Sequence, residues 1–163
     1  MKKVQIFILT VIVIVIAIVV LAVVSNKNQL AKENPVRLAA VDKVAQCLTD
    51  TGVKFYGASW CPHCARQKGL FMKSAKKLPY IECSTAGAGS PQTQACIDAN
   101  ITSYPTWEFG IGDRMANEIT PIDLADKAKC ILDDAERAEL IVQKSEHTKE
   151  VEALKANQTI PIQ

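Results

Sequence analysis

The segment Trp60–Cys64, of sequence Trp-Cys-Pro-His-Cys, follows the apolar run Val53–Gly57 after two intervening residues, and this succession constrains the fold more than any other feature. A buried strand that leads into the N-terminus of a helix would place Cys61 where unpaired backbone N–H groups and the helix dipole favour negative charge. Pro62 suits the first helical position, because it has no N–H to satisfy and its φ is already helical. The pattern therefore predicts a strand, a Cys-x-x-Cys turn and a helix in succession.

Two cysteines separated by two residues at such a turn are typical of a redox-active pair. At a helix N-terminus, or beside a cationic side chain, cysteine pKa values fall from about 8.5 to between about 3.5 and 7. Stabilising the thiolate also makes the disulfide easier to reduce and therefore a stronger oxidant. We predict that Cys61, Cys64 and His63 are the catalytic residues of a thiol–disulfide oxidoreductase.

The N-terminal region contains a long apolar run, Val4–Val24, which carries no charged residue and follows Lys2 and Lys3. At about 1.5 Å per residue this run gives about 31 Å of helix, which matches a hydrocarbon core of about 30 Å. It exceeds the apolar region of a cleaved signal peptide, usually about 7–15 residues, which is the alternative interpretation. The run predicts a signal-anchor transmembrane helix over residues 1–25. The lysines place the protein in the plasma (inner) membrane as a single-pass protein, with the catalytic domain facing the periplasm or cell exterior.

Charge and cysteine content exclude one class of partner and indicate a compartment. The formal net charge is +2, and subtracting Lys2 and Lys3 leaves zero for the remainder, so no basic surplus points to nucleic acid. Six cysteines in an exported chain of this size indicate an oxidising environment, in which disulfides persist.

The remainder of the chain alternates between helical and strand patterns after a polar tether over residues 26–37. The expected helices are 36–48, 62–77, 92–99 and 122–132, and the expected strands are 53–58, 79–83, 106–110 and 114–119. Alternation followed by a terminal hairpin predicts an α/β domain over residues 38–132, with a mixed central sheet and helices on both faces. This is the thioredoxin-like fold.

The last segment, residues 133–163, has a different composition and is rich in charged residues. Asp133 and Arg137 form an i,i+4 pair, and Leu140 and Val151 fit a helical spacing that Lys144 and His147 interrupt. The pattern favours a solvated or partly frayed charged helix over a coiled-coil seam.

The remaining cysteines are predicted to be structural. A Cys83–Cys96 bond would close a loop of about 14 residues and stabilise the fold by about 3 kcal/mol. We favour this role over a second redox pair that relays electrons to the Cys-x-x-Cys. The twelve residues between Cys83 and Cys96 disfavour a zinc site, and c-type haem attachment requires a histidine at position 65, so neither metal nor cofactor is expected. Cys47 and Cys130 are expected to be free buried thiols, on helices that cover opposite faces of the sheet.

Ser103–Thr106, which contains Pro105, precedes an expected strand. A cis proline facing the Cys-x-x-Cys would leave the backbone polar groups of Tyr104 free to pair with an extended substrate. The alternative is a trans proline at the start of a strand. The position of Pro105 after the Cys-x-x-Cys favours a cis peptide bond. We predict that Tyr104 and Pro105 bind substrate and that Trp60 adds an apolar contact.

Four separated blocks, 55–64, 80–83, Cys96 and 101–107, resemble the thioredoxin-like domain that is fused to bacterial homologues of vitamin K epoxide reductase. The resemblance covers about residues 38–130. It implies that the Cys-x-x-Cys takes electrons from secreted proteins and passes them to the quinone-linked membrane enzyme, and that the second cysteine pair is structural. One predicted span cannot supply the four-helix enzyme, so such a partner is expected in trans. Thioredoxins carry a buried acid where this chain has Phe55, which leaves Glu82 as a candidate for handling the proton of Cys64.

The expected reaction is the oxidation of exported protein thiols by the Cys61–Cys64 disulfide, followed by electron transfer to the membrane partner. The first alternative is a reductase or isomerase with the same site, because thiol–disulfide exchange is reversible and its direction depends on the potential. The second is a non-catalytic peptide-binding module in which the motif is only a structural disulfide.

Overall fold

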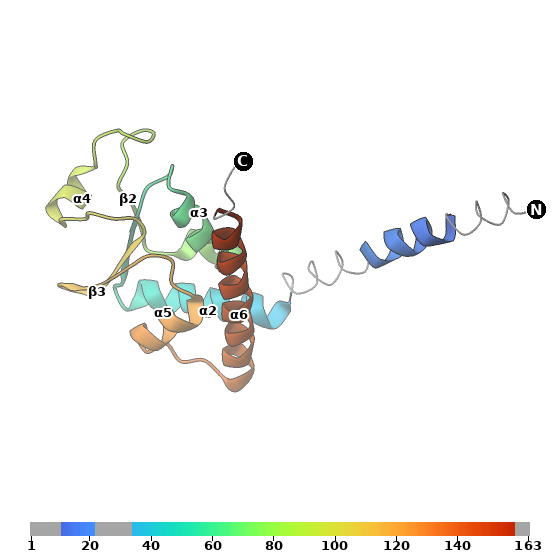
Figure 1. The fold of residues 1–163 in the computed structure, drawn as a ribbon. Coiled ribbons are helices and arrows are strands. Elements are labelled where there is room, and N and C mark those ends of the chain that lie inside the picture. Colours follow the sequence, from blue (N-terminus) through green and yellow to red (C-terminus); the bar gives the residue numbers. More distant parts are fainter. Residues whose placement is uncertain (1–10, 22–33, 159–163) are drawn as a thin grey trace, which may run out of the picture. The chain divides into compact units, whose positions relative to one another are not determined.

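The computed structural model describes residues 11–21 and 34–158. Residues 11–21 are helical, and the described residues from Val36 onward belong to a separate compact unit. The elements in chain order are α2 (Pro35–Asp50), β1 (Lys54–Gly57), α3 (Pro62–Gly69), the 3-10 helix η1 (Met72–Lys77), β2 (Tyr80–Glu82), α4 (Gln94–Asp98), β3 (Thr106–Gly110), β4 (Asp113–Ala116), α5 (Pro121–Ala128) and α6 (Asp134–Gln158) (Figure 1).

The four strands form one mixed sheet in the order β2-β1-β3-β4. β1 runs parallel to β2 and antiparallel to β3, and β3 pairs antiparallel with β4. Consecutive residues of a strand point to opposite faces, so Phe55 enters the main core and Tyr56 enters a smaller cluster that includes Cys96 of α4. The predicted α/β arrangement, a mixed sheet with helices on both faces, is present.

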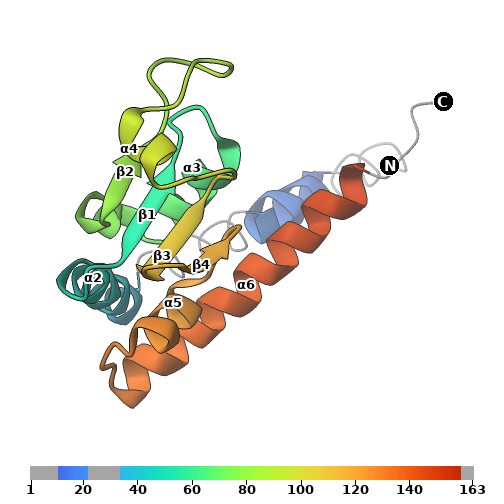
Figure 2. The same cartoon turned by 90° about the vertical axis from the view of Figure 1, so that its left-hand side faces the viewer.

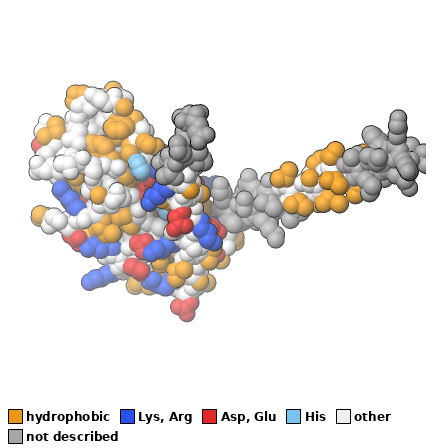
Figure 3. All heavy atoms as spheres, viewed as in Figure 1, with side chains coloured by type: hydrophobic (Ala, Val, Ile, Leu, Met, Phe, Trp, Pro, Cys, Tyr) orange, Lys and Arg blue, Asp and Glu red, His pale blue; other side chains and the backbone are white. Residues whose placement is uncertain are grey.

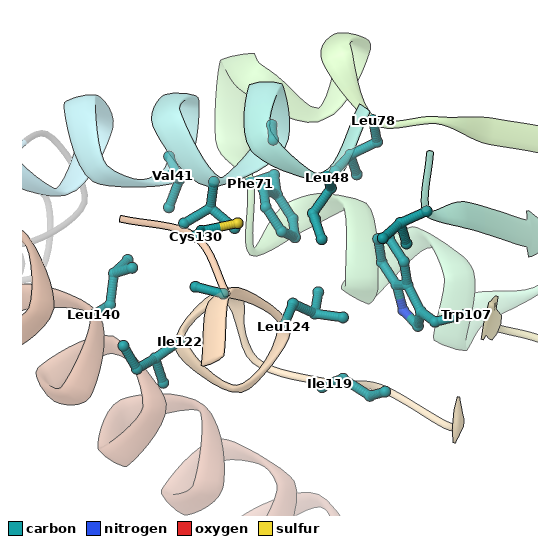
Figure 4. Packing of buried hydrophobic residues seen from close by; sticks show 14 of the residues in the cluster. Val41, Leu48, Phe71, Leu78, Trp107, Ile119, Ile122, Leu124, Cys130 and Leu140 are labelled. Carbon is teal, nitrogen blue, oxygen red and sulfur yellow. The ribbon is translucent and has the colours of Figure 1, made fainter. Parts of the chain in front are cut away.

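The main core lies on the Phe55 face of the sheet. Phe55 stacks on Trp107 of β3, with ring centroids 4.3 Å apart. Helix α2 carries apolar residues at helical spacing, so one of its sides is completely buried. The buried residues are Ala40, Val41, Val44, Ala45 and Leu48. Helix α5 adds Ile122, Leu124 and Ala125 to the same core (Figure 4). Each large apolar side chain buried in this way stabilises the fold by about 1.5–3 kcal/mol.

The helix expected over residues 62–77 is divided into α3 and η1. Met72 has a φ of +50°, a left-handed conformation that interrupts the helix. Phe71, immediately before the interruption, is fully buried in the main core. The active-site helix is therefore short and is anchored to the core at its C-terminal end.

Cys47 and Cys130 form a disulfide, with Cα atoms 5.9 Å apart. The prediction that they are free thiols on opposite faces of the sheet is wrong. Helices α2 and α5 contribute to the same core, and Lys129, with a φ of +58°, turns the chain back after α5. This turn brings Cys130 against α2, as Figure 4 shows.

The charged C-terminal segment forms a 25-residue helix, α6, which lies along α5 (Figure 2). The less exposed residues of this helix recur every three or four positions, at Leu140, Gln143, His147 and Val151. Leu140 is fully buried, and the amide of Gln143 donates to the carbonyl oxygen of Leu70 at 2.7 Å. Two of the four inward positions are polar, so hydropathy alone did not reveal this packing face.

A buried cation ties α6 to α2. Arg37 is only 3% exposed, and its guanidinium lies 2.7 Å from the carboxylate of Glu139 and 2.8 Å from that of Glu146. A buried charge is tolerated when partners of opposite charge satisfy it. Two carboxylates of α6 do so here, which makes α6 part of the folded domain.

The prediction of a transmembrane helix over residues 1–25 is contradicted by the part of the chain that the structure describes. Within 11–21 and 34–158, no helix combines the length and the hydrophobicity needed to cross a bilayer. The rest of the predicted span, and most of the predicted tether 26–37, lie outside the described residues. The membrane anchor and the inner-membrane location inferred from it are therefore withdrawn.

Candidate active site

Cys61 is the N-cap residue of α3, with extended dihedral angles (φ −80°, ψ 119°), and Pro62 is the first helical residue. The carbonyl oxygen of Cys61 accepts a hydrogen bond from the N–H of Ala65 at 3.1 Å, so the helix begins directly after the sulfur-bearing residue. The N–H groups of the first turn have no partner within the helix. Cys61 therefore lies at the positive end of α3, as the sequence predicted.

The two thiols of the motif are not bonded to each other and differ in exposure. Cys61 is 6% exposed, whereas Cys64 is 1% exposed. The Cys61 thiol donates to the carbonyl oxygen of Tyr104, with 3.8 Å between sulfur and oxygen. Cys64 lies over Gly57, where a Cβ atom would come within 2.9 Å of its sulfur. Both cysteines are thus buried, and Cys61 is the more exposed of the two.

Burial raises the pKa of the Cys64 thiol to about 12, and the neighbouring Cys61 acts in the same direction. A backbone hydrogen bond at Ala58 and the charge of Lys68 oppose this effect without cancelling it. Phe55, which stands where thioredoxins carry a buried acid, lies in the apolar core. Cys64 therefore keeps its proton at neutral pH.

The raised pKa predicts that the reduced protein loses stability at high pH. Between the ordinary thiol pKa of 9.0 and about 12, the unfolded chain releases the Cys64 proton while the folded chain keeps it. The free energy of unfolding should then fall by up to about 1.4 kcal/mol per pH unit. Urea unfolding at several pH values above 8 would measure this slope for the reduced wild type and for reduced Cys64→Ala. Parallel pH profiles for the two proteins would contradict the prediction.

The side chain of His63 is bound to Glu118 rather than to the Cys61 thiol. Its Nδ1 lies 2.6 Å from Oε1 of Glu118, and the guanidinium of Arg66 lies 2.6 Å from the same oxygen. Nδ1 of His63 also lies 2.7 Å from Arg66, so it can donate to Glu118 when protonated or accept from Arg66 when not. Burial raises the pKa of Glu118, but the hydrogen bonds from Arg66 and His63 outweigh it and hold that pKa below its usual range.

The three residues predicted to bind substrate lie close to the sulfur of Cys61. The Tyr104–Pro105 peptide bond is cis, as the sequence favoured, and the carbonyl of Tyr104 faces Cys61. The rings of Trp60 and Tyr104 pack edge to face, with 6.2 Å between their centroids. Trp60 is 44% exposed. Figure 3 shows that the upper part of the domain, where α4 lies, carries few charged side chains. An extended apolar peptide can lie against this surface beside Trp60 and Tyr104.

Glu82 fixes the loop that carries the motif. Its Oε1 accepts hydrogen bonds from the N–H groups of Ser59 and Ser84 at 3.0 and 2.9 Å, and its Oε2 accepts from the hydroxyl of Tyr80 at 2.9 Å. Burial raises the pKa of Glu82, but these hydrogen bonds outweigh it and hold the pKa below its usual range. Such a carboxylate is a poor acceptor for the Cys64 proton, so the structure favours a positioning role.

Cys83 and Cys96 are joined by a disulfide, with Cα atoms 5.5 Å apart, so the predicted pairing is present. Both residues are buried, at 1% and 0% exposure. The next residue, Ser84, accepts a hydrogen bond from the indole N–H of Trp60 at 3.0 Å. The disulfide thus holds the loop that supports Trp60, and its role as a staple rather than a second redox pair stays a prediction.

Sequence reasoning missed two residues that hold the site, Glu118 and Gln67. Gln67 is fully buried, and its amide donates to the carbonyl oxygen of Ile119 at 2.8 Å and accepts from the N–H of Ile119 at 2.7 Å. Its position three residues after Cys64, on the same side of α3, could have indicated an inward side chain. Glu118 had no such signal, because its partners on α3 lie more than 50 residues away in the chain.

The chemistry available at this site is that of two thiols. Within the two described ranges, no group of three or more His, Cys, Asp or Glu side chains is arranged to hold a metal ion. Of the two thiols, the one at the start of α3 belongs to the more exposed residue. Such a pair can form a mixed disulfide with another molecule and then close on itself.

Comparison with known proteins supports a redox enzyme. No protein-family model matches the chain. The chain is similar to the thiol-disulfide oxidoreductase LTO1 of Arabidopsis thaliana, with 41% identity over 96 residues. The match covers 56% of this chain and 25% of that protein, so the chain matches about a quarter of the length of this relative.

Proposed function

We propose that this chain is a thiol–disulfide oxidoreductase that uses Cys61 and Cys64 to oxidise protein thiols. The observation that carries the proposal is the asymmetry of the pair. Cys61 sits at the N-terminus of α3 with part of its surface exposed, and Cys64 lies behind it with a raised pKa. The similarity to a protein named for this activity supports the same conclusion.

In the proposed reaction, a substrate thiolate attacks the sulfur of Cys61 in the Cys61–Cys64 disulfide. The disulfide breaks, a mixed disulfide forms at Cys61, and Cys64 leaves as a thiolate that takes up a proton because burial raises its pKa. A second substrate thiolate then attacks the substrate sulfur of the mixed disulfide and releases Cys61 as a thiolate. The substrate loses two electrons and forms a disulfide, and the enzyme gains both electrons.

The cis-Pro105 loop and Trp60 are proposed to hold the substrate during this exchange. The carbonyl of Tyr104 lies beside Cys61, so a peptide bound next to this loop would present its cysteine to the sulfur of Cys61. The exposed face of Trp60 offers apolar contact.

The partner that reoxidises the site is proposed to be a quinone-linked membrane enzyme homologous to vitamin K epoxide reductase, acting in trans. This part of the proposal rests on the sequence resemblance. The partner would accept attack by the Cys61 thiolate on its own disulfide, after which Cys64 would resolve the mixed disulfide. Purified partner and reduced protein should then exchange electrons, with quinone as the final acceptor.

An assay with a model peptide that contains two cysteines tests the function directly. With glutathione disulfide as the oxidant, the protein should accelerate the formation of the peptide disulfide over the uncatalysed rate. The redox potential of Cys61–Cys64 separates an oxidase from a reductase, because a value well above the thioredoxin value of about −270 mV favours oxidation. A strongly reducing potential with active insulin reduction would favour the reductase, and no catalysis in either direction would favour a peptide-binding module.

A further inference from the structure

Three side chains that can carry positive charge converge on the buried carboxylate of Glu118. His63 and Arg66 come from α3 and each lies 2.6 Å from Oε1. His147 comes from α6, and its Nε2 lies 3.6 Å from Oε2. Only 10% of the Glu118 side chain is exposed, so water screens these charges weakly. Glu118 therefore joins side chains of α3 to a side chain of α6.

Arg66 and His63 lie on the short helix that begins directly after Cys61. Arg66 lies five residues after Cys61 on the same short helix, and the negative charge of the Cys61 thiolate helps to raise the pKa of Arg66, after the larger effect of Glu118. Glu150 of α6 acts in the same direction. A positive charge near the start of α3 favours negative charge there, and a carboxylate that neutralises Arg66 weakens this effect.

We propose that Glu118 is a positioning residue that restrains the oxidising power of the Cys61–Cys64 pair by neutralising Arg66 and holding His63 at the side of α3. The proposal rests on the redox function proposed above. Reduction of the disulfide creates the Cys61 thiolate, so a less compensated positive charge beside it favours the reduced form. His147 lies on the other side of the same carboxylate, which makes α6 a part of the redox site.

Equilibration of Cys61–Cys64 with glutathione tests the proposal. In this exchange, two glutathione thiols reduce the protein disulfide and leave as glutathione disulfide. Glu118→Gln keeps the shape of the side chain and removes its charge, so the equilibrium should shift toward the reduced protein by about threefold or more at pH 7. Arg66→Gln should shift it by a similar factor in the opposite direction, and the double variant should lie within about twofold of the wild type.

The opposite signs distinguish an electrostatic role from a structural one. Glu108→Gln is the matched control, because the Glu108 side chain is also only 9% exposed and also lies 2.6 Å from an arginine, Arg114. In the sheet, however, Glu108 lies opposite Lys54, at the end of β1 that is far from the motif. This control should leave the equilibrium unchanged. Shifts of Glu118→Gln and Arg66→Gln in the same direction, or no shift in either, would overturn the proposal.

Failure of the proposal and failure of the proposed function would be distinguishable. The glutathione equilibrium is measured on the cysteine pair itself and does not require catalysis of peptide oxidation. If Glu118→Gln does not fold, the shift of Arg66→Gln toward the oxidised protein still decides the matter, because removing a positive charge near a thiolate disfavours the reduced form. A peptide assay without catalysis, together with the predicted shifts, would reject the function and keep the role of Glu118.

Discussion

Replacing Cys61 by serine is expected to abolish peptide oxidation, whereas replacing Cys64 is expected to stop the exchange halfway. The rate with Cys61→Ser should fall by about 1,000-fold or more, because the sulfur that other molecules can reach is lost. Cys64→Ser keeps that sulfur but has no internal thiol to release a bound partner. It should therefore accumulate a mixed disulfide through Cys61.

The difference between the two variants follows from burial. Cys64 is 1% exposed, and its sulfur lies over Gly57, where even a Cβ atom would have no room. A protein thiol cannot approach such a sulfur from outside. Cys61 has an exposed part beside the Tyr104 carbonyl and lies at the positive end of α3. The difference in burial thus assigns the exchange with other molecules to Cys61 and the resolving role to Cys64.

Incubation with a disulfide-containing peptide, followed by non-reducing electrophoresis and mass spectrometry, would measure the mixed disulfide. The adduct is expected with Cys64→Ser and not with Cys61→Ser or the double variant. The two structural disulfides provide an internal control, since neither should exchange with the peptide. An adduct of equal yield on Cys61→Ser would show that Cys64 is reachable and would reject the assigned roles.

The active-site turn could be predicted from sequence because its signals are local. The run Val53–Gly57, the helix-starting Pro62 and the two cysteines lie within a dozen residues, and each favours the same structure. The cis bond at Pro105 was favoured by its position after the Cys-x-x-Cys, and the Cys83–Cys96 pairing by the short loop between the two cysteines. Where local signals agree, a short window of sequence is enough to place a site.

The parts that sequence reasoning missed depend on contacts between distant residues. Glu118 meets His63 across 55 positions, and no pattern near either residue marks the contact. The packing face of α6 was hidden because Gln143 and His147 are polar and find partners only in the folded domain, at Leu70 and Glu118. The buried face of a helix includes such residues when another element satisfies them.

The Cys47–Cys130 disulfide is another contact between distant residues that the sequence did not reveal. It leads to a second prediction with a large effect. Replacing both cysteines by serine should lower the free energy of unfolding by about 4.5 kcal/mol, because the bond closes a loop across 83 positions and limits the freedom of the unfolded chain. In a domain of this size, the melting temperature should fall by roughly 15 °C. Thermal and urea unfolding followed by circular dichroism would measure both changes, with Cys61–Cys64 oxidised in every protein.

The Cys83–Cys96 pair provides the matched control for this prediction. Its loop is much shorter, with a separation of 13 positions, so the double serine variant should lose only about 3 kcal/mol. In activity the order should be reversed, so that the Cys83–Cys96 variant loses more activity than the Cys47–Cys130 variant. Cys83 adjoins the residue that holds Trp60, whereas Cys47 and Cys130 join α2 to the end of α5, on the main core. A smaller loss of stability for the Cys47–Cys130 variant than for the control would mean that the long loop is already restricted in the unfolded chain, and chain entropy would not explain the stabilisation.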